Sequence, residues 1–441
     1  MASIQKRGKT YQFKVSLGRD ADGKQIRETK TYIPKSTTPK ALKKELAAAA
    51  RDFEREVREG RYLSGEKITF QEFTEKYWKP QWASVHLTQS VMEGYIDLIE
   101  RWAYPVFKVI KIARIMPLHI QGIIDTMRNK GLAPKTIKRV YTAINSVFTF
   151  AYRMKIVQEN PCTRCELPKI QQDTELHYFT VPQAKAFLAF LDQPYTSTYS
   201  AHTRTDDTDL DYSVPEYTET HIMQYQFRVF FNLAIYGGFR RGELVAMQWQ
   251  DIDFENCAIS VNRAAAKVSG GQIIKEPKTK KSARTLIMPA ESMQLLREWK
   301  KRQQELSIKL GTIWKGKRGK RYDENFVFIQ IDSGLMMYLD TPGRKFRQTI
   351  DRYNDRIDAK IKDASEAEAE KLQAEKLPRI RLHDLRHTSA TILLADGVDI
   401  ETVSHRMGHA HASTTLDIYG HPLPELDKSA AAAIEKIFSK A

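Results

Sequence analysis

The sequence predicts an α+β protein that is mainly helical, with a small N-terminal β-sheet domain, a helical domain and a larger mixed α/β region. Three observations predict this fold. Apolar residues alternate near the N-terminus as they do in strands, they recur at helical spacing between about residues 70 and 154, and the remaining stretch combines both patterns. A chain of 441 residues is long enough for two or three domains. We expect them at 1–64, 65–165 and 177–441.

The N-terminal segment predicts a two- or three-stranded sheet. Residues 10–17 alternate apolar and polar side chains, Asp22-Gly23 is a hairpin signal, and residues 25–33 return as a second strand. Residues 2–7 can add a third strand. The stretch from Pro39 to about residue 61 is rich in Ala, Lys and Glu, which favours a connector helix.

Positive charge is concentrated in this same segment. The chain holds 70 Lys and Arg against 54 Asp and Glu, a net charge of +16. Residues 1–44 hold 12 Lys and Arg against 3 Asp and Glu, a net charge of +9. A ribbon with Lys14, Arg27 and Lys30 on it fits the major groove of DNA. A plain solvated sheet face explains the pattern of this segment equally well.

The second part predicts a compact helical domain. Thr69 and Glu72 have the spacing of a capping box, and helices are expected at about 70–84, 88–103, 117–130 and 134–154. The apolar stripe of the last helix is core. Lys135, Lys138 and Arg139 lie mostly off that stripe, so we expect one basic surface.

The third part follows a polar linker at about 160–176. Its expected elements are helices at 181–191 and about 222–236, strands at about 258–263 and 284–288 around a basic turn, and a solvated charged helix at 355–377. Residues 195–220 look like a surface insertion. Residues 425–441 predict a tail helix whose apolar face packs on its own domain or on a neighbouring protomer.

Three patches of this region carry side chains suited to phosphate chemistry. They are 238–244 with Arg240, 277–284 with Lys278, and 383–419 with His383, Arg386, His409 and Tyr419. Arg240 lies in a Gly-rich turn that opens a helix, where backbone N–H groups favour an anion. His383 and Arg386 are three residues apart and share one face of a helix.

These residue types fit metal-free transfer of a phosphoryl group. Two arginines match phosphate oxygens and can stabilise the charge of a pentacoordinate phosphorus. Lysine and histidine can move protons to the leaving oxygen and from the attacking oxygen. A tyrosine that attacks phosphorus forms a covalent ester, which conserves the energy of the broken bond.

Each of these signals also has an ordinary structural explanation. An isolated His-x-x-Arg is usually structural, a lone tyrosine is often half-buried in a helix, and a basic hairpin can be any surface turn. His405, His409 and His411 suggest a zinc site, but the Glu of the zinc-protease helix motif is missing. Cys162 and Cys165 have the spacing of half a zinc site without a second pair. The order and combination of the patches outweigh these explanations.

In this order and spacing, the three patches resemble the catalytic domain of the tyrosine recombinase (integrase) family, which includes phage and conjugative-transposon integrases. They match its Gly-Leu-Arg-Arg-Gly-Glu-Leu box, its Pro-Lys-Thr hairpin, its His-Asp-Leu-Arg-His and Leu-Gly-His boxes and its late tyrosine. Phe239 and Met407 stand where leucine is usual. Lys280 and Lys281 crowd Lys278, which leaves the choice of lysine open.

The resemblance implies a role for each site residue. Arg240 and Arg386 would clamp the phosphate, Lys278 would be the general acid for the 5′-hydroxyl, and His383 and His409 would support proton transfer. Tyr419 would be the nucleophile that forms a 3′-phosphotyrosyl intermediate. The segment 65–165 resembles the family's core-binding domain, 1–64 resembles an arm-binding domain, and 177–441 would be the catalytic domain with its tail helix.

The implied function is a site-specific DNA recombinase, a DNA strand transferase that integrates and excises a mobile element or prophage. Its expected partners are double-stranded attachment sites, further copies in a tetramer that passes through a Holliday junction, and a DNA-bending or excision protein. No cofactor or metal is expected. Neither a secretory signal nor a membrane-length apolar run is visible, which suggests the bacterial cytoplasm, in association with DNA.

Three other functions use some of the same features. A type IB topoisomerase shares the chemistry but relaxes DNA as a monomer, and the arm-like domain and the tail after Tyr419 favour a recombinase. A non-enzymatic DNA-binding regulator would not need the complete catalytic set. A metal-dependent nuclease would stop cleaving DNA in EDTA.

Overall fold

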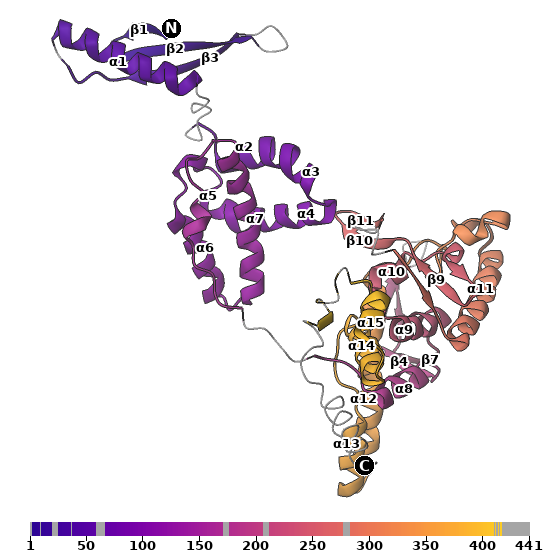
Figure 1. The fold of residues 1–441 in the computed structure, drawn as a ribbon. Coiled ribbons are helices and arrows are strands. Elements are labelled where there is room, and N and C mark those ends of the chain that lie inside the picture. Colours follow the sequence, from indigo (N-terminus) through magenta and orange to yellow (C-terminus); the bar gives the residue numbers. More distant parts are fainter. Residues whose placement is uncertain are drawn as a thin grey trace, which may run out of the picture. The chain divides into compact units, whose positions relative to one another are not determined.

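The computed structural model describes residues 2–8, 10–19, 25–36, 38–58, 67–170, 176–205, 211–276, 283–409, 411, 413, 415 and 416 (Figure 1). The chain splits into two compact units, Met1–Gln172 and Asp173–Ala441. The division into three domains at 1–64, 65–165 and 177–441 stays a prediction. The Asp22-Gly23 turn, Lys278, Tyr419 and the tail helix at 425–441 lie outside the described residues.

The first unit begins with a three-stranded antiparallel sheet, as predicted. Its strands are β1 (Ser3–Arg7), β2 (Thr10–Arg19) and β3 (Gln25–Tyr32), in the order β1-β2-β3, and helix α1 (Pro39–Arg58) follows. Phe13 and Val15 point from β2 into a small hydrophobic core with Phe53 of α1. The alternation of apolar side chains along β2 therefore has the cause expected from the sequence, burial of one face of the sheet.

A carboxylate of α1 holds the segment that leaves β3. Glu45 accepts hydrogen bonds from the Tyr32 hydroxyl (2.8 Å) and from the backbone N–H groups of Lys35 and Ser36 (both 2.9 Å). These donors, with the N–H of Lys35 first, lower the pKa of Glu45 to about 2. The same side chain thus ties sheet and helix together.

The rest of this unit is helical and close to prediction. Its elements are α2 (Phe70–Phe73), the π-helical η1 (Thr74–Ala83), α3 (Ser84–His86), α4 (Gln89–Leu98), the π-helical η2 (Ile99–Ala103), α5 (Tyr104–Phe107), the 3-10 turn η3 (Ile112–Arg114), α6 (Pro117–Asn129), α7 (Pro134–Arg153) and the 3-10 turn η4 (Pro161–Arg164). The capping box of Thr69 and Glu72 opens the domain as predicted. Buried aromatic rings such as Phe70, Phe107 and Phe148 form its core.

The second unit is built around a buried helix, α9 (Tyr225–Gly237). Helices α8 (Val181–Phe190), α11 (Ala290–Leu310), α12 (Thr341–Lys362) and α14 (Asp384–Ala395) pack against it, and α15 (Ile400–Met407) packs on α14. Phe187, Phe231 and Phe346 contact one another at this core. The two 3-10 turns η7 (Gly311–Ile313) and η8 (Gly319–Glu324) follow α11. Because α9 is surrounded, its end is held firmly beside α14 and α15.

The strand prediction for this unit was incomplete. The strands β12 (Arg284–Ile287), β9 (Ala258–Val261) and β8 (Ile252–Asp253) form one sheet in that order. An additional hairpin of β10 (Ala264–Val268) and β11 (Gly271–Lys275) lies between β9 and β12 in the chain. Gly270, with φ of +80°, permits its tight turn. The basic segment therefore follows this hairpin instead of directly joining the two expected strands.

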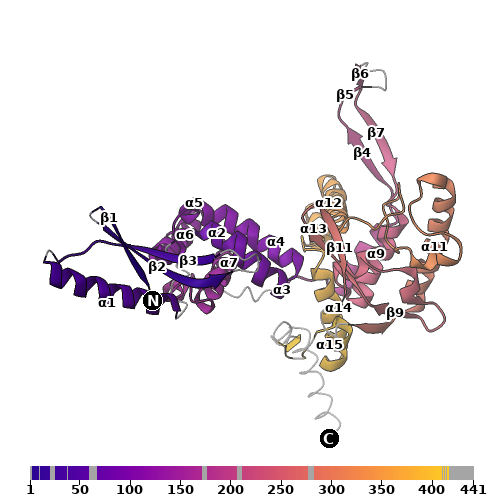
Figure 2. The ribbon, with the colours of Figure 1, turned by 90° about the horizontal axis from the view of Figure 1, so that it is seen from above.

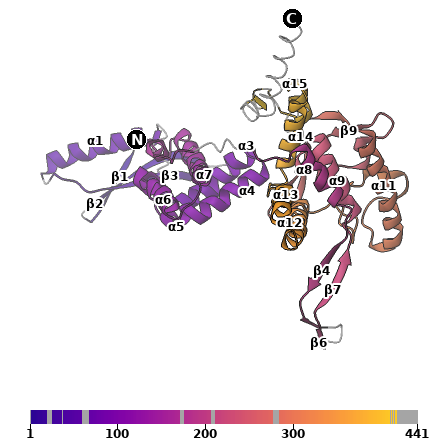
Figure 3. The same cartoon turned by 90° about the horizontal axis from the view of Figure 1, so that it is seen from below.

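The predicted insertion forms a ribbon. Strand β4 (Tyr195–Tyr199) pairs with β7 (Tyr217–His221), and β5 (His202–Thr205) pairs with β6 (Asp211–Val214). The ribbon projects from the body of the second unit (Figure 2 and Figure 3). Its exposed position agrees with a surface insertion.

The prediction of one charged helix over 355–377 was wrong. The segment divides between the end of α12 and a separate helix, α13 (Glu366–Glu375). Ser365 has an extended conformation at the start of α13, so the helical hydrogen bonds do not continue through it. No helix in the described ranges is long and apolar enough to cross a membrane.

Candidate active site

The Gly-rich turn after α9 places Arg240 at the start of a short helix, α10 (Arg241–Val245). Gly238 has φ of +59°, and a Cβ there would lie 2.4 Å from Cε of Met407. The positive φ favours glycine at this position, and the absent Cβ leaves room for the end of the Met407 side chain. The sequence suggested that the backbone N–H groups of this turn would receive an anion. In the structure the N–H of Arg240 donates to Oε2 of Glu243 at 2.9 Å, so a carboxylate of the chain itself occupies this donor.

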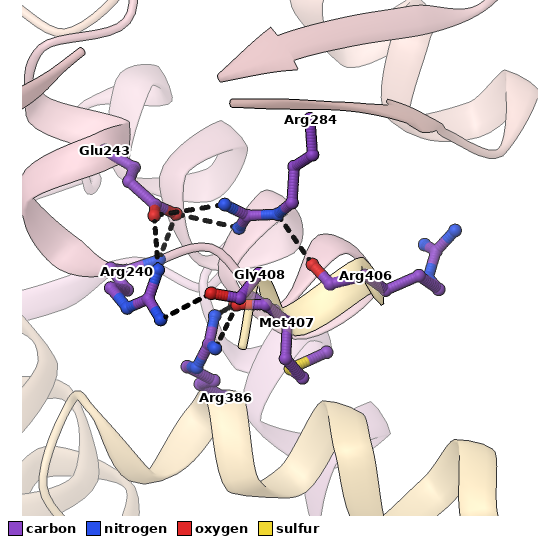
Figure 4. A network of polar contacts seen from close by, with 8 residues as sticks. Arg240, Glu243, Arg284, Arg386, Arg406, Met407 and Gly408 are labelled. Carbon is purple, nitrogen blue, oxygen red and sulfur yellow. Dashed lines mark hydrogen bonds and ion pairs between the residues drawn. The ribbon is translucent and has the colours of Figure 1, made fainter. Parts of the chain in front are cut away.

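One buried carboxylate is shared between two arginines (Figure 4). Glu243 accepts from Nη1 of Arg240 at 2.9 Å and from Nη1 and Nη2 of Arg284 at 3.1 and 2.9 Å. Burial by itself raises the pKa of Glu243, but the hydrogen bonds and charges of Arg284 and Arg240 outweigh it and hold that pKa below its ordinary value. Glu243 is therefore a carboxylate at neutral pH.

Three arginines from different elements converge on consecutive carbonyl groups at the end of α15. Nε of Arg284 donates to the carbonyl of Arg406 at 2.8 Å, Arg386 donates to that of Met407, and Nη2 of Arg240 donates to that of Gly408 at 3.1 Å (Figure 4). The last carbonyls of a helix lack partners within it and carry partial negative charge. The arginines satisfy this helix end.

Arg386 also reaches the turn after α9, because its Nη1 donates to the carbonyl of Gly238 at 2.7 Å. Arg386 is almost completely buried, whereas the side chain of Arg240 is 39% exposed. The solvent-facing guanidinium of the pair is therefore that of Arg240.

The histidines of the site are neutral at physiological pH. Burial lowers the pKa of His383, and the charge on Arg386 lowers it further. Burial and the charges on Arg386 and Arg240 lower the pKa of His409 to about 4, and Nδ1 of His409 lies 2.8 Å from Oγ1 of Thr415. Burial lowers the pKa of a third histidine, His387, to about 4, together with repulsion from His383 once that residue is protonated.

The structure brings Arg240, Arg386, His383 and His409 into one electrostatic cluster, since the charges on both arginines act on both histidines. The two remaining predicted site residues, Lys278 and Tyr419, lie outside the described residues. In the part of the chain that the structure describes, no three His, Cys, Asp or Glu side chains gather as they would around a metal ion.

Sequence reasoning missed two members of this network, Glu243 and Arg284. It counted Arg284 as the end of the basic patch 277–284 and the start of a strand at about 284–288, without a role; the residue does begin β12, and its side chain is 1% exposed. A signal was available in the sequence, because alternate residues of a strand share a face and Arg284 alternates with the apolar Leu286 and Met288. This period of two puts Arg284 on the inner face of the strand.

A second basic site lies in the first unit, between α4 and α7. A groove of about 600 Å³ is lined by Ser90, Val91, Tyr95, Lys135, Lys138, Arg139 and Thr142. A Cβ on Gly94 would lie 3.2 Å from Nη2 of Arg139, so the glycine leaves room for this guanidinium. The three cations are those that the sequence placed on a basic surface.

Comparison with known proteins shows which family part of this chain resembles. Residues 213–425 match the model of the "Phage integrase family". The chain is 26% identical to the ICEBs1 integrase of Bacillus subtilis (strain 168) over 436 residues, 97% of each protein. It is 25% identical to a tyrosine recombinase XerC-like protein of Caldanaerobacter subterraneus subsp. tengcongensis, over 98% of each.

A solved structure has a similar fold. It is the Tn1549 transposon integrase in complex with circular intermediate DNA, with a TM-score of 0.57, 22% identity and coverage of 84% of this chain and 100% of that one. The predicted fold class, mainly helical α+β with a catalytic domain of tyrosine recombinase type, is thereby confirmed. Residues 213–425 are therefore a domain of the phage integrase family, as the resemblance to tyrosine recombinases implied.

Proposed function

We propose that this protein is an integrase that cleaves and rejoins double-stranded DNA at attachment sites through a 3′-phosphotyrosyl intermediate, and so integrates and excises a mobile element or prophage. The observation that carries the proposal is the cluster of Arg240, Arg386, His383 and His409 at the end of α15, within a phage integrase domain. The relative named ICEBs1 integrase matches over nearly the whole chain, which supports the same class of function.

The proposed reaction exchanges one phosphate ester for another. The Tyr419 oxygen attacks the scissile phosphorus, the bond to the 5′ oxygen breaks, and a 3′-phosphotyrosine forms. Lys278 gives a proton to the leaving 5′ oxygen, and a neutral histidine of the cluster takes the proton of the tyrosine. Attack by a 5′-hydroxyl of a partner strand reverses these steps and rejoins the DNA. No hydrolysis or external energy source is needed.

The arginines supply the charge that this reaction needs. A phosphoryl transition state gathers negative charge on its non-bridging oxygens, and preorganised guanidinium groups stabilise it. Each guanidinium has five N–H groups. The side chain of Arg240 uses two of them for Glu243 and Gly408 among the described residues, so others stay available to a phosphate. Because the side chain of Arg240 is partly exposed, a phosphate can reach its guanidinium from solvent.

The test of the nucleophile is covalent capture. Full-length protein is incubated with a nicked suicide substrate in EDTA, and a protease-sensitive DNA adduct is expected. Tyr419→Phe should bind the same DNA and form no adduct. An adduct that persists in this variant would refute the assignment, and cleavage that forms no adduct and stops in EDTA would favour a metal-dependent nuclease.

The test of the general acid uses a better leaving group. Lys278→Ala should be slow on ordinary DNA and should recover on a substrate whose bridging 5′ oxygen is replaced by sulfur, which leaves without a proton. Lys280→Ala and Lys281→Ala are the matched controls. Recovery that occurs with one of these two variants instead would move the role to that lysine.

The proposed partners follow from the same function. We expect the groove with Lys135, Lys138 and Arg139 to contact DNA phosphates at the core site, and residues 1–64 to bind a second DNA site. Strand exchange would proceed in a tetramer on DNA, with a DNA-bending or excision protein as an accessory partner. Relaxation of supercoiled plasmid lacking attachment sites by a monomer would favour a type IB topoisomerase instead.

A further inference from the structure

Arg284 is a buried cation to which neither the sequence nor the proposed reaction gives a role. Its side chain is 1% exposed, and all three of its nitrogen atoms are engaged. Nη1 and Nη2 bond Glu243, Nε bonds the carbonyl of Arg406, and the guanidinium lies 6.0 Å from the ring centroid of Phe239. A guanidinium held this completely is placed to fix the groups that it touches.

The first of these groups controls the charge of Arg240. Glu243 bonds Arg240 and Arg284 together, so the three side chains carry one net positive charge. Without Arg284, the carboxylate would be paired with Arg240 alone. Because interactions between charges are strong at buried sites, Arg240 would then be drawn to Glu243 and largely neutralised. Because Arg284 neutralises part of the charge of Glu243, the positive charge of Arg240 stays available to an incoming anion.

The second group is the peptide at the end of α15. A Cβ on Gly408 would lie 2.7 Å from Nη1 of Arg284, so this peptide packs directly on the guanidinium. The adjoining carbonyls of Met407 and Gly408 are those that receive Arg386 and Arg240, and His409 follows immediately. A shift of Arg284 would therefore move the bonding partners of both arginines.

We propose that Arg284 is a positioning residue for phosphate recognition, which acts through Glu243 and through the 406–408 peptide without touching DNA. It keeps the charge of Arg240 available to the non-bridging oxygens of the scissile phosphate and fixes the helix end to which Arg240 and Arg386 are bonded. The inference rests on the proposed function, because it concerns the same phosphate site.

Two variants separate the effect of the positive charge of Arg284 from that of its forked guanidinium group. Arg284→Lys keeps the positive charge but loses the fork that holds Glu243 and the Arg406 carbonyl together. Arg284→Gln loses the charge. The control is Arg263→Lys, because Nη1 of Arg263 pairs with the buried Asp251 at 2.5 Å in the same unit and none of its bonds reaches the cluster. Thermal unfolding and DNA binding at low salt identify the variants that fold. If Arg284→Gln does not fold, the comparison of Arg284→Lys with wild type is enough to test the proposal.

The readout compares single-turnover adduct formation on two suicide substrates. One has an ordinary scissile phosphate, and the other has a methylphosphonate, in which a methyl group replaces a charged non-bridging oxygen. We expect Arg284→Lys to be slowed about 10- to 100-fold on the phosphate. On the methylphosphonate the slowing should be at least about tenfold smaller, because the neutral centre needs less positive charge.

The outcomes are distinct. Equal slowing of Arg284→Lys on both substrates would show general structural damage and overturn the proposal, and so would an unchanged rate on the phosphate. Arg263→Lys should change both rates by the same factor, and a selective loss in this control would also overturn it. Failure of the wild-type protein to form any adduct on the phosphate would refute the proposed function itself.

Discussion

Replacement of Gly242 by alanine sets two effects of opposite sign against each other. Gly242 lies in the first turn of α10, where alanine has the better helix propensity. A Cβ at this position would lie 2.5 Å from the backbone oxygen of Ala265 in β10. Because that atom belongs to a paired strand, it cannot rotate away as a flexible side chain would. Either β10 or α10 must move.

The clash should outweigh the gain in propensity. Alanine gains at most about 1 kcal/mol over glycine, and less in a first turn. Forcing an extra methyl group into a packed site costs about 1–3 kcal/mol. We therefore expect Gly242→Ala to lower the free energy of unfolding by about 1–2 kcal/mol. It should also slow adduct formation, because a displaced α10 carries Glu243 away from Arg284 and moves Arg240 with it.

The matched control is Gly343, a first-turn glycine of α12 in the same unit, with no atom within 4 Å of its added Cβ. Gly343→Ala should be neutral or stabilising by up to about 1 kcal/mol. Urea unfolding can be followed by hydrogen exchange in peptides of α9, which lies in the core of this unit. If Gly242→Ala is as stable as Gly343→Ala and forms the adduct at the wild-type rate, the reasoning about this contact is wrong.

Two further predictions concern pH and DNA binding. His387 and His409 have pKa values of about 4 in the folded protein, below the ordinary histidine value, so the unfolded chain binds more protons between about pH 4 and 6.5. The free energy of unfolding should therefore decrease as the pH falls through this window. His409→Gln should make this dependence on pH, measured by urea unfolding, less steep. If the dependence is as steep in His409→Gln as in wild type, the pKa of His409 is not depressed by folding. Deletion of residues 1–64, whose first 44 residues carry a net charge of +9, should leave cleavage of the core site intact, reduce the salt dependence of DNA binding and abolish binding to a second site. Normal recombination of full attachment sites by the truncated protein would argue against a separate arm.

The elements that were predicted well are those with local signals. The alternation along residues 10–17, the capping box of Thr69 and Glu72, and the apolar stripe of 134–154 each involve side chains within a turn or two of one another. Strand pleat and helical pitch convert such spacings directly into a buried face. The family was predicted differently, from the order of the three patches between residues 238 and 419, which requires no knowledge of the fold.

The sequence by itself thus determined the type of most elements, the residues suited to phosphate chemistry and the family, whereas only the tertiary structure decided how the site is held. Arg284 meets Glu243 across 41 positions of the chain, the carbonyl of Arg406 lies 122 positions from Arg284, and that of Gly408 lies 168 positions from Arg240. No local period relates such residues, because their pairing depends on how α9, α15 and β12 pack. The buried carboxylate between two arginines is a product of that packing, since burial makes each unpaired charge costly and so fixes which partners must meet.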